Sequence, residues 1–178
     1  GTEQLKKNNI TVVKSLADNA AKELVWLLCS DGLYKCKDGV LSKAHNYPYS
    51  VDELGNALKT LSISGDGKIY TATKNIGLVE FSAEKNSTTV YPFSKKDDKA
   101  YSNNNADALI WLEDNQLLVA TKEAGLAVFN TAQKKFSFFN QDNFPESDIF
   151  NFQATAFGSN KTHIAFATQN KGIWVYNI

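Results

Sequence analysis

Short apolar segments recur along the whole chain, and polar turns rich in Gly, Asp and Asn separate them. The longest continuous apolar run, Leu24–Cys29, has the length of a buried strand and is far shorter than a membrane span. No segment shows the 3.6-residue period of an amphipathic helix. The chain is therefore predicted to be all-β.

The predicted strands form four groups of similar layout. In the second group, the Gly-Asp-Gly sequence at positions 65–67 predicts a tight turn with positive backbone angles. The groups are Thr11–Leu16, Leu24–Cys29, Leu33–Lys37 and Val40–Ala44; Leu58–Ser64, Ile69–Thr73, Leu78–Ser82 and Thr88–Phe93; Ala108–Leu112, Gln116–Thr121, Leu126–Asn130 and Lys135–Phe139; and Gln153–Phe157, His163–Thr168 and Gly172–Asn177.

The four groups are copies of one internal repeat. A repeat of this length, made of short strands, predicts the blades of a β-propeller. The copies align on four glycines, and in the last three copies the same residue types recur at fixed distances before and after each glycine. The glycines are Gly32, Gly77, Gly125 and Gly172, and the recurring residues are Ala72, Ala120 and Ala167; Thr73, Thr121 and Thr168; Asn56, Asn104 and Asn151; and Phe81, Phe129 and Tyr176.

These repeated residues are interpreted as scaffold rather than as a ligand site. The glycines are expected in the connections between second and third strands, where backbone angle or close approach of a neighbour requires them. The small Ala permits contact between blades, and the Thr hydroxyl can satisfy a loop amide. The repeated Asn is expected to hydrogen-bond within its own turn.

The predicted domain organisation is a lead-in at residues 1–10 followed by a propeller segment at 11–178, with blades at about 11–47, 56–94, 104–140 and 151–178. The last blade stops after its third strand. The residues that precede Thr11 are too few to supply the missing strand. We therefore expect a partial propeller with an exposed strand edge at each end, although a closed ring of four blades stays open as an alternative. Such edges invite pairing with a second copy or with remaining blades of the parent protein.

Charge and composition narrow the range of partners. Nineteen lysines balance nineteen acidic residues, so the formal net charge is zero, and there is no arginine. The chain thus lacks the positive field and the bidentate guanidinium groups that usually bind nucleic acid, so this partner is not expected. No apolar run could span a membrane. The sequence has no Met, and Gly1 resembles the residue that tag cleavage leaves, so we expect a piece of a longer protein.

The two cysteines lie on consecutive predicted strands. A two-residue turn at Asp31-Gly32 would place Cys29 opposite Tyr34 and Cys36 opposite Leu27, so the two thiols would be diagonal neighbours. We expect buried free thiols, because a free Cys behaves as a small apolar residue. A disulfide remains the alternative.

Three segments of the chain resemble the two-component regulator propeller repeat. They are Leu61–Phe81, with the sequence LSISGDGKIYTATKNIGLVEF, and the weaker copies Trp111–Phe129 and Thr162–Tyr176. In that family, an inner strand and an Asp-Gly turn precede an aromatic-containing strand that ends in Thr, and a Gly with an apolar residue follows. The resemblance covers Ala57–Ile178 well and Thr11–Lys43 poorly.

This chain departs from the family at two positions of the second strand. The usual Trp is Tyr70, Leu118 or Ala165, and the usual Gly before Thr is Ala. The resemblance implies a periplasmic or extracellular sensor segment of a bacterial hybrid two-component regulator. In such regulators the propellers precede a membrane span and a kinase. Similar members sense oligosaccharides released from polysaccharides.

A ligand is expected on the propeller face where the inter-blade links and the loops between second and third strands meet. Tyrosines among amides and carboxylates suit a sugar, because a flat ring packs on the pyranose and planar groups bind its hydroxyls. Alternatively, these tyrosines pack over blade edges. The candidate ligand-binding residues are Tyr47, Tyr49, Asp52, Lys74, Asn75, Tyr101, Lys122, Glu123, Asn143, Phe144, Gln169 and Asn170.

Catalysis has little support in the sequence. His45 and His163 occupy non-equivalent positions, and there is no metal-spaced cluster, nucleophile elbow or phosphate loop. No catalytic residue, metal or cofactor is therefore expected. The leading hypothesis is a non-enzymatic ligand sensor, the second is a protein-interaction scaffold, and the third is a propeller hydrolase or lyase that would use Asp52 or Glu146.

Overall fold

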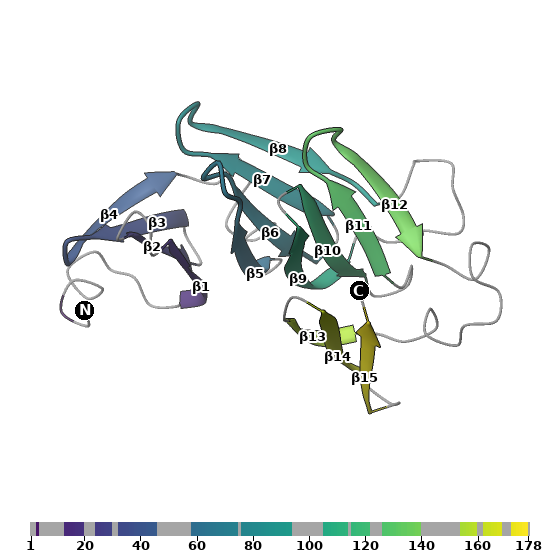
Figure 1. Ribbon diagram of the computed structural model, residues 1–178. Helices are drawn as coiled ribbons and strands as arrows, with labels where there is room; N and C mark the ends of the chain where they lie inside the picture. The colour runs from purple at the N-terminus through teal and green to yellow at the C-terminus, as the bar shows by residue number, and fades with distance from the viewer. Residues whose placement is uncertain are drawn as a thin grey trace.

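The structure, a computed structural model, is a succession of four antiparallel β-sheets that follow one another along the chain (Figure 1). Each sheet is one blade, and its strands neighbour one another in sequence order. The structure describes residue 3 and residues 13–19, 24–29, 32–45, 58–74, 76–93, 105–113, 115–121, 126–139, 154–159, 162–168 and 172–177.

The first three blades have four strands each, and blade 4 has three among the described residues. Blade 1 contains β1 (Val13–Asn19), β2 (Leu24–Cys29), β3 (Gly32–Lys37) and β4 (Val40–His45), and blade 2 contains β5 (Leu58–Ile63), β6 (Ile69–Thr73), β7 (Leu78–Ser82) and β8 (Ser87–Tyr91). Blade 3 contains β9 (Ala106–Glu113), β10 (Gln116–Thr121), β11 (Leu126–Asn130) and β12 (Lys135–Phe139), and blade 4 contains β13 (Ala154–Ser159), β14 (His163–Thr168) and β15 (Ile173–Asn177).

Every predicted strand is present, so the all-β fold class is confirmed. The largest displacement is in β1, which was expected at Thr11–Leu16 and runs instead from Val13 to Asn19. The short apolar segments form strands because successive side chains point to opposite faces, and a blade between two neighbours buries both faces. In β6 all five residues, Ile69–Thr73, are buried.

Neighbouring blades pack face to face through three hydrophobic clusters. Leu28 and Leu33 of blade 1 meet Ile69 and Phe81 of blade 2. A second cluster joins blades 2 and 3, and a third joins blades 3 and 4. Residues of opposite parity in β10 belong to different clusters, so one strand serves two interfaces.

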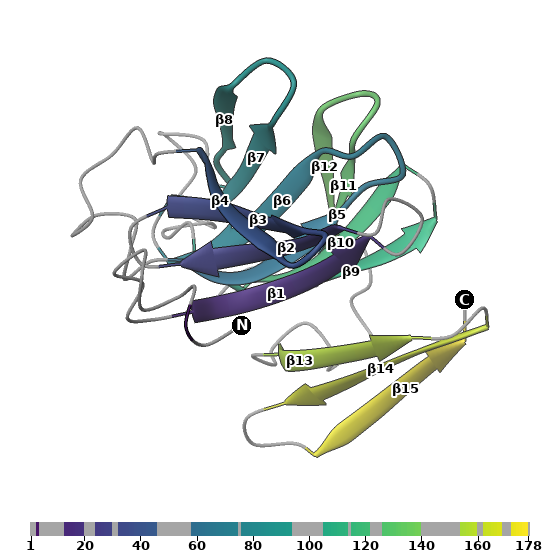
Figure 2. The same ribbon diagram turned by 90° about the vertical axis from the view of Figure 1, so that its left-hand side faces the viewer.

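The blades form an open row rather than a closed ring. The first strands contact one another in order, β1 with β5, β5 with β9 and β9 with β13. No contact of that extent joins β1 to β13 within the described strands, and Figure 1 shows the N-terminal and C-terminal sheets at opposite ends of the row. Figure 2 shows β13, β14 and β15 as a separate sheet at the C-terminal end. The expectation of a partial propeller with an incomplete last blade is confirmed.

The hairpin between β2 and β3 differs from the prediction. Gly32 does not lie in the turn but begins β3, where it pairs with Cys29. Cys36 consequently pairs with Val25 rather than with Leu27, so the pairing register moves by two residues. Both cysteines are free thiols, as expected, but only Cys29 is buried, and Cys36 is partly exposed.

Two hairpin turns show how local sequence determines strand register. Asp38 and Gly39 join β3 to β4 with φ values of 49° and 74°, which is the pattern of a two-residue type I′ turn. At the predicted Gly-Asp-Gly turn, only Gly67 has a positive φ, of 83°. The backbone of Ser64 there accepts from Gly67 and donates to Lys68.

Candidate ligand-binding surfaces

The predicted ligand face is represented by one described residue, Lys74. This lysine directly follows Thr73 at the end of β6, and its side chain is exposed. The other eleven candidates lie outside the described residues; they are Tyr47, Tyr49, Asp52, Asn75, Tyr101, Lys122, Glu123, Asn143, Phe144, Gln169 and Asn170.

Repeat residues hold the backbone around Lys74 in place. The Thr73 hydroxyl donates to the carbonyl oxygen of Gly77 at 2.5 Å, so this hydroxyl satisfies a carbonyl and not the loop amide that the sequence suggested. Gly77 has φ of 108°, and a Cβ there would meet the carbonyl oxygen of Tyr91 and approach Pro92 Cα to 2.9 Å. Both predicted reasons for a glycine, backbone angle and close approach, are confirmed at this position.

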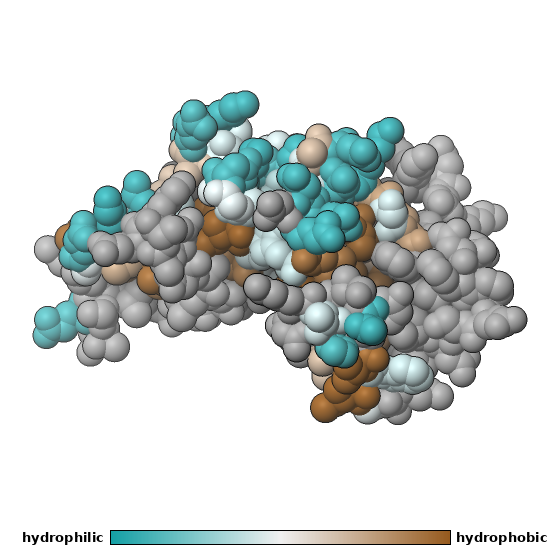
Figure 3. Space-filling view, in the orientation of Figure 1, coloured by the Kyte–Doolittle hydropathy of each residue, from teal (hydrophilic) through white to brown (hydrophobic). Residues whose placement is uncertain are grey.

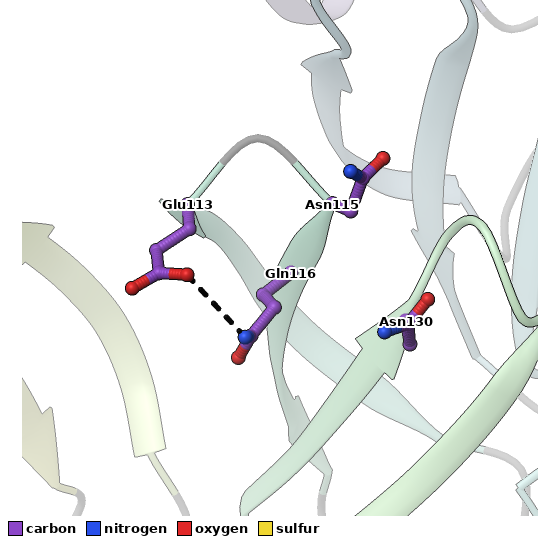
Figure 4. A pocket seen from close by; sticks show the side chains of 4 residues that line it. All are labelled: Glu113, Asn115, Gln116 and Asn130. Carbon is purple, nitrogen blue, oxygen red and sulfur yellow. Dashed lines mark hydrogen bonds between the residues drawn. The ribbon is translucent and has the colours of Figure 1, made fainter.

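A polar pocket lies in blade 3, beside the β9–β10 and β11–β12 turns, at the end of the blade opposite to the predicted ligand face (Figure 4). Its volume is about 540 Å³, and it is lined by Glu113, Asn115, Gln116 and Asn130. Gln116 Nε2 and Glu113 Oε2 are 3.5 Å apart. Gln116 and Asn130 are direct partners across β10 and β11. The pocket thus presents amides and one carboxylate from adjacent strands.

Hydrogen bonds between the two turns hold this pocket in shape. Thr131 donates its backbone amide to the carbonyl oxygen of Asn115 at 2.9 Å, and its hydroxyl lies 3.3 Å from Asn115 Oδ1. Asn130 Oδ1 accepts from the amides of Ala132 and Gln133 at 3.0 and 2.8 Å. The four lining side chains can bind hydroxyl groups of a ligand, but they include no aromatic ring for stacking against a sugar.

A buried ionic cluster joins blade 2 to blade 3. Glu80 of β7 accepts hydrogen bonds at Oε2 from the hydroxyls of Tyr70 and Tyr91, at 3.1 and 3.0 Å. Lys134, in the β11–β12 turn, reaches across the interface and donates to the same oxygen at 2.6 Å. Its ammonium nitrogen also lies 5.5 Å from the Tyr91 ring centre and 6.0 Å from that of Phe129.

The surroundings of Glu80 favour its charged form. Burial raises the pKa of the Glu80 carboxyl, but the hydrogen bonds from Lys134 and Tyr91 and the charge of Lys134 outweigh it, so the net pKa is lowered. Burial and the nearby carboxylate raise the pKa of Tyr91 to about 12. The pKa of Tyr70 is raised for the same two reasons. Both phenols therefore remain hydrogen-bond donors at neutral pH.

The Glu80 cluster is a contact between blades rather than a ligand site, because its members already satisfy one another. The sequence interpretation did not include it. A signal was present, since Glu80 occupies the repeat position of the apolar residues Val128 and Val175. A lone carboxylate in an apolar position indicates a buried partner of opposite charge.

A metal centre and a membrane-spanning helix are both absent from the described residues. No group of three or more His, Cys, Asp or Glu side chains within them could hold a metal ion. No helix found in those parts of the chain combines the length and apolar character that a membrane span requires.

Known proteins are similar to this chain in structure. No protein-family model and no curated protein matches its sequence. The extracellular domain of BT3049, described as a hybrid two component system of Bacteroides thetaiotaomicron, aligns over 93% of this chain and 23% of its own, with a TM-score of 0.69 and 19% identity. The chain has a β-propeller fold.

Two further solved structures give the same architecture. The extracellular domain of BT4673, described as a hybrid two component system of the same organism, aligns over 94% of this chain and 21% of its own, with a TM-score of 0.67 and 16% identity. Virginiamycin B lyase from Staphylococcus aureus aligns over 93% and 55%, with a TM-score of 0.61 and 14% identity. This chain spans less than a quarter of either two-component domain. At these identities the similarity shows the fold.

Proposed function

We propose that this chain is a ligand-sensing segment of the extracellular or periplasmic propeller of a bacterial two-component regulator, and that it is not an enzyme. The observation that carries the proposal is the alignment of nearly the whole chain with the extracellular domain of BT3049. The repeat sequence at Leu61–Phe81, which resembles the two-component regulator propeller repeat, supports the same class independently of the structural similarity.

The proposed ligand is an oligosaccharide bound on the face that carries Lys74. On this face the sequence places Tyr49 and Tyr101 in the links between blades, with Asn75 and Asn170 in the hairpin loops. Aromatic faces and planar amides together suit a sugar ring and its hydroxyls. The hydrogen bond from the Thr73 hydroxyl to the Gly77 carbonyl oxygen supports this assignment, because it connects the two ends of the β6–β7 loop.

A panel of plant, fungal and host oligosaccharides tests the proposal by thermal shift and calorimetry on the full chain and on the ectodomain that contains it. The expected result is a saturable rise in melting temperature with one class of sugar. Tyr101→Ala should abolish this rise, while Gln116→Ala, in the polar pocket at the other end of blade 3, should leave it unchanged. Binding that depends on Gln116 and not on Tyr101 would place the ligand in the polar pocket of blade 3 and would contradict the proposed binding face. A complete lack of response in the ectodomain would refute the sensor role.

A second candidate function is a protein-interaction scaffold. Blade 4 favours it, because its outermost described strand leaves Ile173 and Val175 exposed. The lyase among the structural neighbours keeps a catalytic propeller as the third candidate. Turnover of a polysaccharide that is lost in Asp52→Asn or Glu146→Gln, with binding retained, would favour that candidate over the sensor.

A further inference from the structure

The ammonium group of Lys134 is surrounded by aromatic rings and one carboxylate at the interface between blades 2 and 3. Its nitrogen lies 5.8 Å from the Tyr70 ring centre, 5.5 Å from that of Tyr91 and 6.0 Å from that of Phe129. It donates to Glu80 Oε2 at 2.6 Å and lies 3.4 Å from the Tyr70 hydroxyl oxygen. We call the group Tyr70, Glu80, Tyr91 and Phe129 the ammonium cage.

The ammonium cage is held together by contacts that do not involve Lys134. The hydroxyls of Tyr70 and Tyr91 donate to Glu80 Oε2 at 3.1 and 3.0 Å, and Tyr70 and Glu80 are direct partners across β6 and β7. The ring centres of Tyr91 and Phe129 are 4.7 Å apart. Tyr70 and Phe129 are fully buried. The walls of the cage should therefore persist when the lysine side chain is removed.

The backbone of Lys134 adopts a conformation that favours another residue type. Its φ is 57°, in the left-handed region, and the corresponding residue of the β7–β8 turn, Asn86, has φ of 46°. Asparagine enters this region more readily than lysine does, because its short side chain can hydrogen-bond locally. The β11–β12 turn thus has a lysine where its backbone favours asparagine. The contacts of the ammonium group with the cage offset this difference.

The composition of the cage favours an ammonium ion that carries N–H groups. An aromatic ring attracts any cation within about 6 Å of its centre, including a quaternary ammonium ion. The carboxylate of Glu80 adds a requirement for a donor, because its Oε2 accepts a charge-assisted hydrogen bond from the lysine nitrogen. A quaternary ammonium ion has no N–H group, and its methyl groups would keep the nitrogen farther from Glu80. A primary alkylammonium ion satisfies both the rings and the carboxylate.

We propose that the ammonium cage is a binding site for a primary alkylammonium ion and that Lys134 is its tethered ligand. Because the turn holds the lysine close to the cage, its effective concentration is high, and it occupies the site in the unchanged protein. When this side chain is shortened, the site should accept a free alkylammonium ion. The Lys134 side chain is 35% exposed, and Figure 3 shows hydrophilic residues at the surface in the region of the β7–β8 and β11–β12 turns, so solvent reaches the site. The proposal does not depend on the sensor role.

Chemical rescue of Lys134→Ala tests the proposal, because n-propylammonium has the same non-hydrogen atoms as the part of the lysine side chain beyond Cβ. In thermal unfolding of the full chain, n-propylammonium chloride should stabilise the variant in a saturable way. For so small a ligand, the dissociation constant should be on the order of 10 mM. At ten times this concentration, the ratio of folded to unfolded protein should rise about elevenfold. The unchanged chain should not respond, because Lys134 already occupies the site.

Lys135→Ala is the matched control, because Lys135 is the adjacent exposed lysine and does not belong to the cage. The amine should not stabilise this variant, and tetramethylammonium chloride at equal ionic strength should not stabilise Lys134→Ala. Glu80→Gln, added to Lys134→Ala, should reduce the response to n-propylammonium at least tenfold. Equal stabilisation of both alanine variants, equal rescue by tetramethylammonium, or no response of Lys134→Ala would each overturn the proposal.

The unchanged chain provides a test that requires no variant to fold. Competitive acetylation with limiting acetic anhydride, followed by tandem mass spectrometry, should label Lys134 several-fold more slowly than Lys135, because the Lys134 nitrogen is engaged by Glu80. Equal labelling rates would show that the cage does not hold the lysine and would overturn the proposal. If circular dichroism shows that Lys134→Ala is unfolded, Lys134→Gly takes its place in the rescue experiment, because glycine adopts a φ of 57° without strain.

Discussion

Removal of the Lys134 ammonium should destabilise the interface between blades 2 and 3. In Lys134→Met the side chain keeps a similar length and apolar body, but the Glu80 carboxylate, whose side chain is 9% exposed, loses the ammonium group that hydrogen-bonds to it. Tyr70 and Tyr91 continue to donate to it. The variant therefore leaves a buried carboxylate that accepts hydrogen bonds from two phenols and has lost its salt bridge to Lys134.

The size of this effect follows from burial. Breaking a buried ion pair by removal of one partner costs about 3–5 kcal/mol. The Lys134 side chain is 35% exposed, so solvent screens part of the attraction, and the two tyrosines limit the loss further. We expect a decrease of about 2 kcal/mol in the free energy of unfolding at pH 7. For a chain of this size, the melting temperature should fall by about 4–8 °C.

Urea and thermal unfolding, followed by circular dichroism, measure this difference. Lys135→Met is the control, because Lys135 is the adjacent residue and is exposed, and its change should stay within about 0.5 kcal/mol. Equal stability of Lys134→Met and the unchanged chain at pH 7 would show that the Glu80 cluster contributes nothing to the interface.

The pH dependence tests whether charge is the cause. Because the folded-state pKa of Glu80 is lowered from the ordinary value of 4.5, its ionisation stabilises the fold above that value, and this contribution is lost as the pH falls through the lowered pKa. In Lys134→Met the lowering by lysine is absent, so the pKa of Glu80 rises. The stability difference between the two proteins should shrink from neutral to acidic pH. A constant difference would attribute the loss to packing of the lysine chain instead.

Three further changes test the repeat positions and the thiols. Gly77→Ala should lower the free energy of unfolding by more than about 2 kcal/mol, because the added Cβ would meet the backbone at the end of β8. Gly172→Ala should lower it by only about 1 kcal/mol, from backbone strain, because the space around Gly172 is open. Equal losses for the two variants in thermal unfolding would contradict this reasoning. Thr73→Val removes the hydroxyl bond to Gly77 and should cost about 1–2 kcal/mol in urea unfolding, and a neutral result would contradict its structural role. Mass spectrometry after maleimide treatment of the native protein should show modification at the partly exposed Cys36 before the buried Cys29, and a protein inert until reduced would indicate a disulfide.

Much of the fold could be predicted because strand pattern and repeat are local properties of the chain. The segments around Ile69–Thr73 and Gln116–Thr121 have the apolar continuity of strands buried on both faces, and they form such strands. The error at Gly32 arose because a shift of the two-residue turn by one position moves each pairing partner by two residues, and the sequence Ser30-Asp31-Gly32 does not distinguish the two turn positions. Boundaries such as those of β1 depend on the partner strand as well as on local sequence.

The candidate sites were less accessible to prediction, because they combine residues from different strands. The loop that carries Lys74 was expected from the repeat, and the structure places this lysine at the exposed end of β6. The pocket formed by Asn115 and Asn130 brings together two turns of one blade, and nothing in either turn alone indicates the other. Glu80 gave a sequence signal by its charge, but its partner Lys134 is 54 residues away.

The sequence by itself determined that this protein is a row of short antiparallel sheets with an incomplete last member, because hydrophobic period, turn residues and repeat spacing are all written along one chain. Tertiary structure alone decided which faces are covered and which charges meet. Glu80 becomes a buried anion only when blade 3 places Lys134 beside it, and Ile173 is exposed because no further blade among the described residues covers that face of blade 4, whereas blade 3 covers its counterpart Leu78. Burial and pairing depend on neighbours, and neighbours in space are set by the packing of one blade on the next.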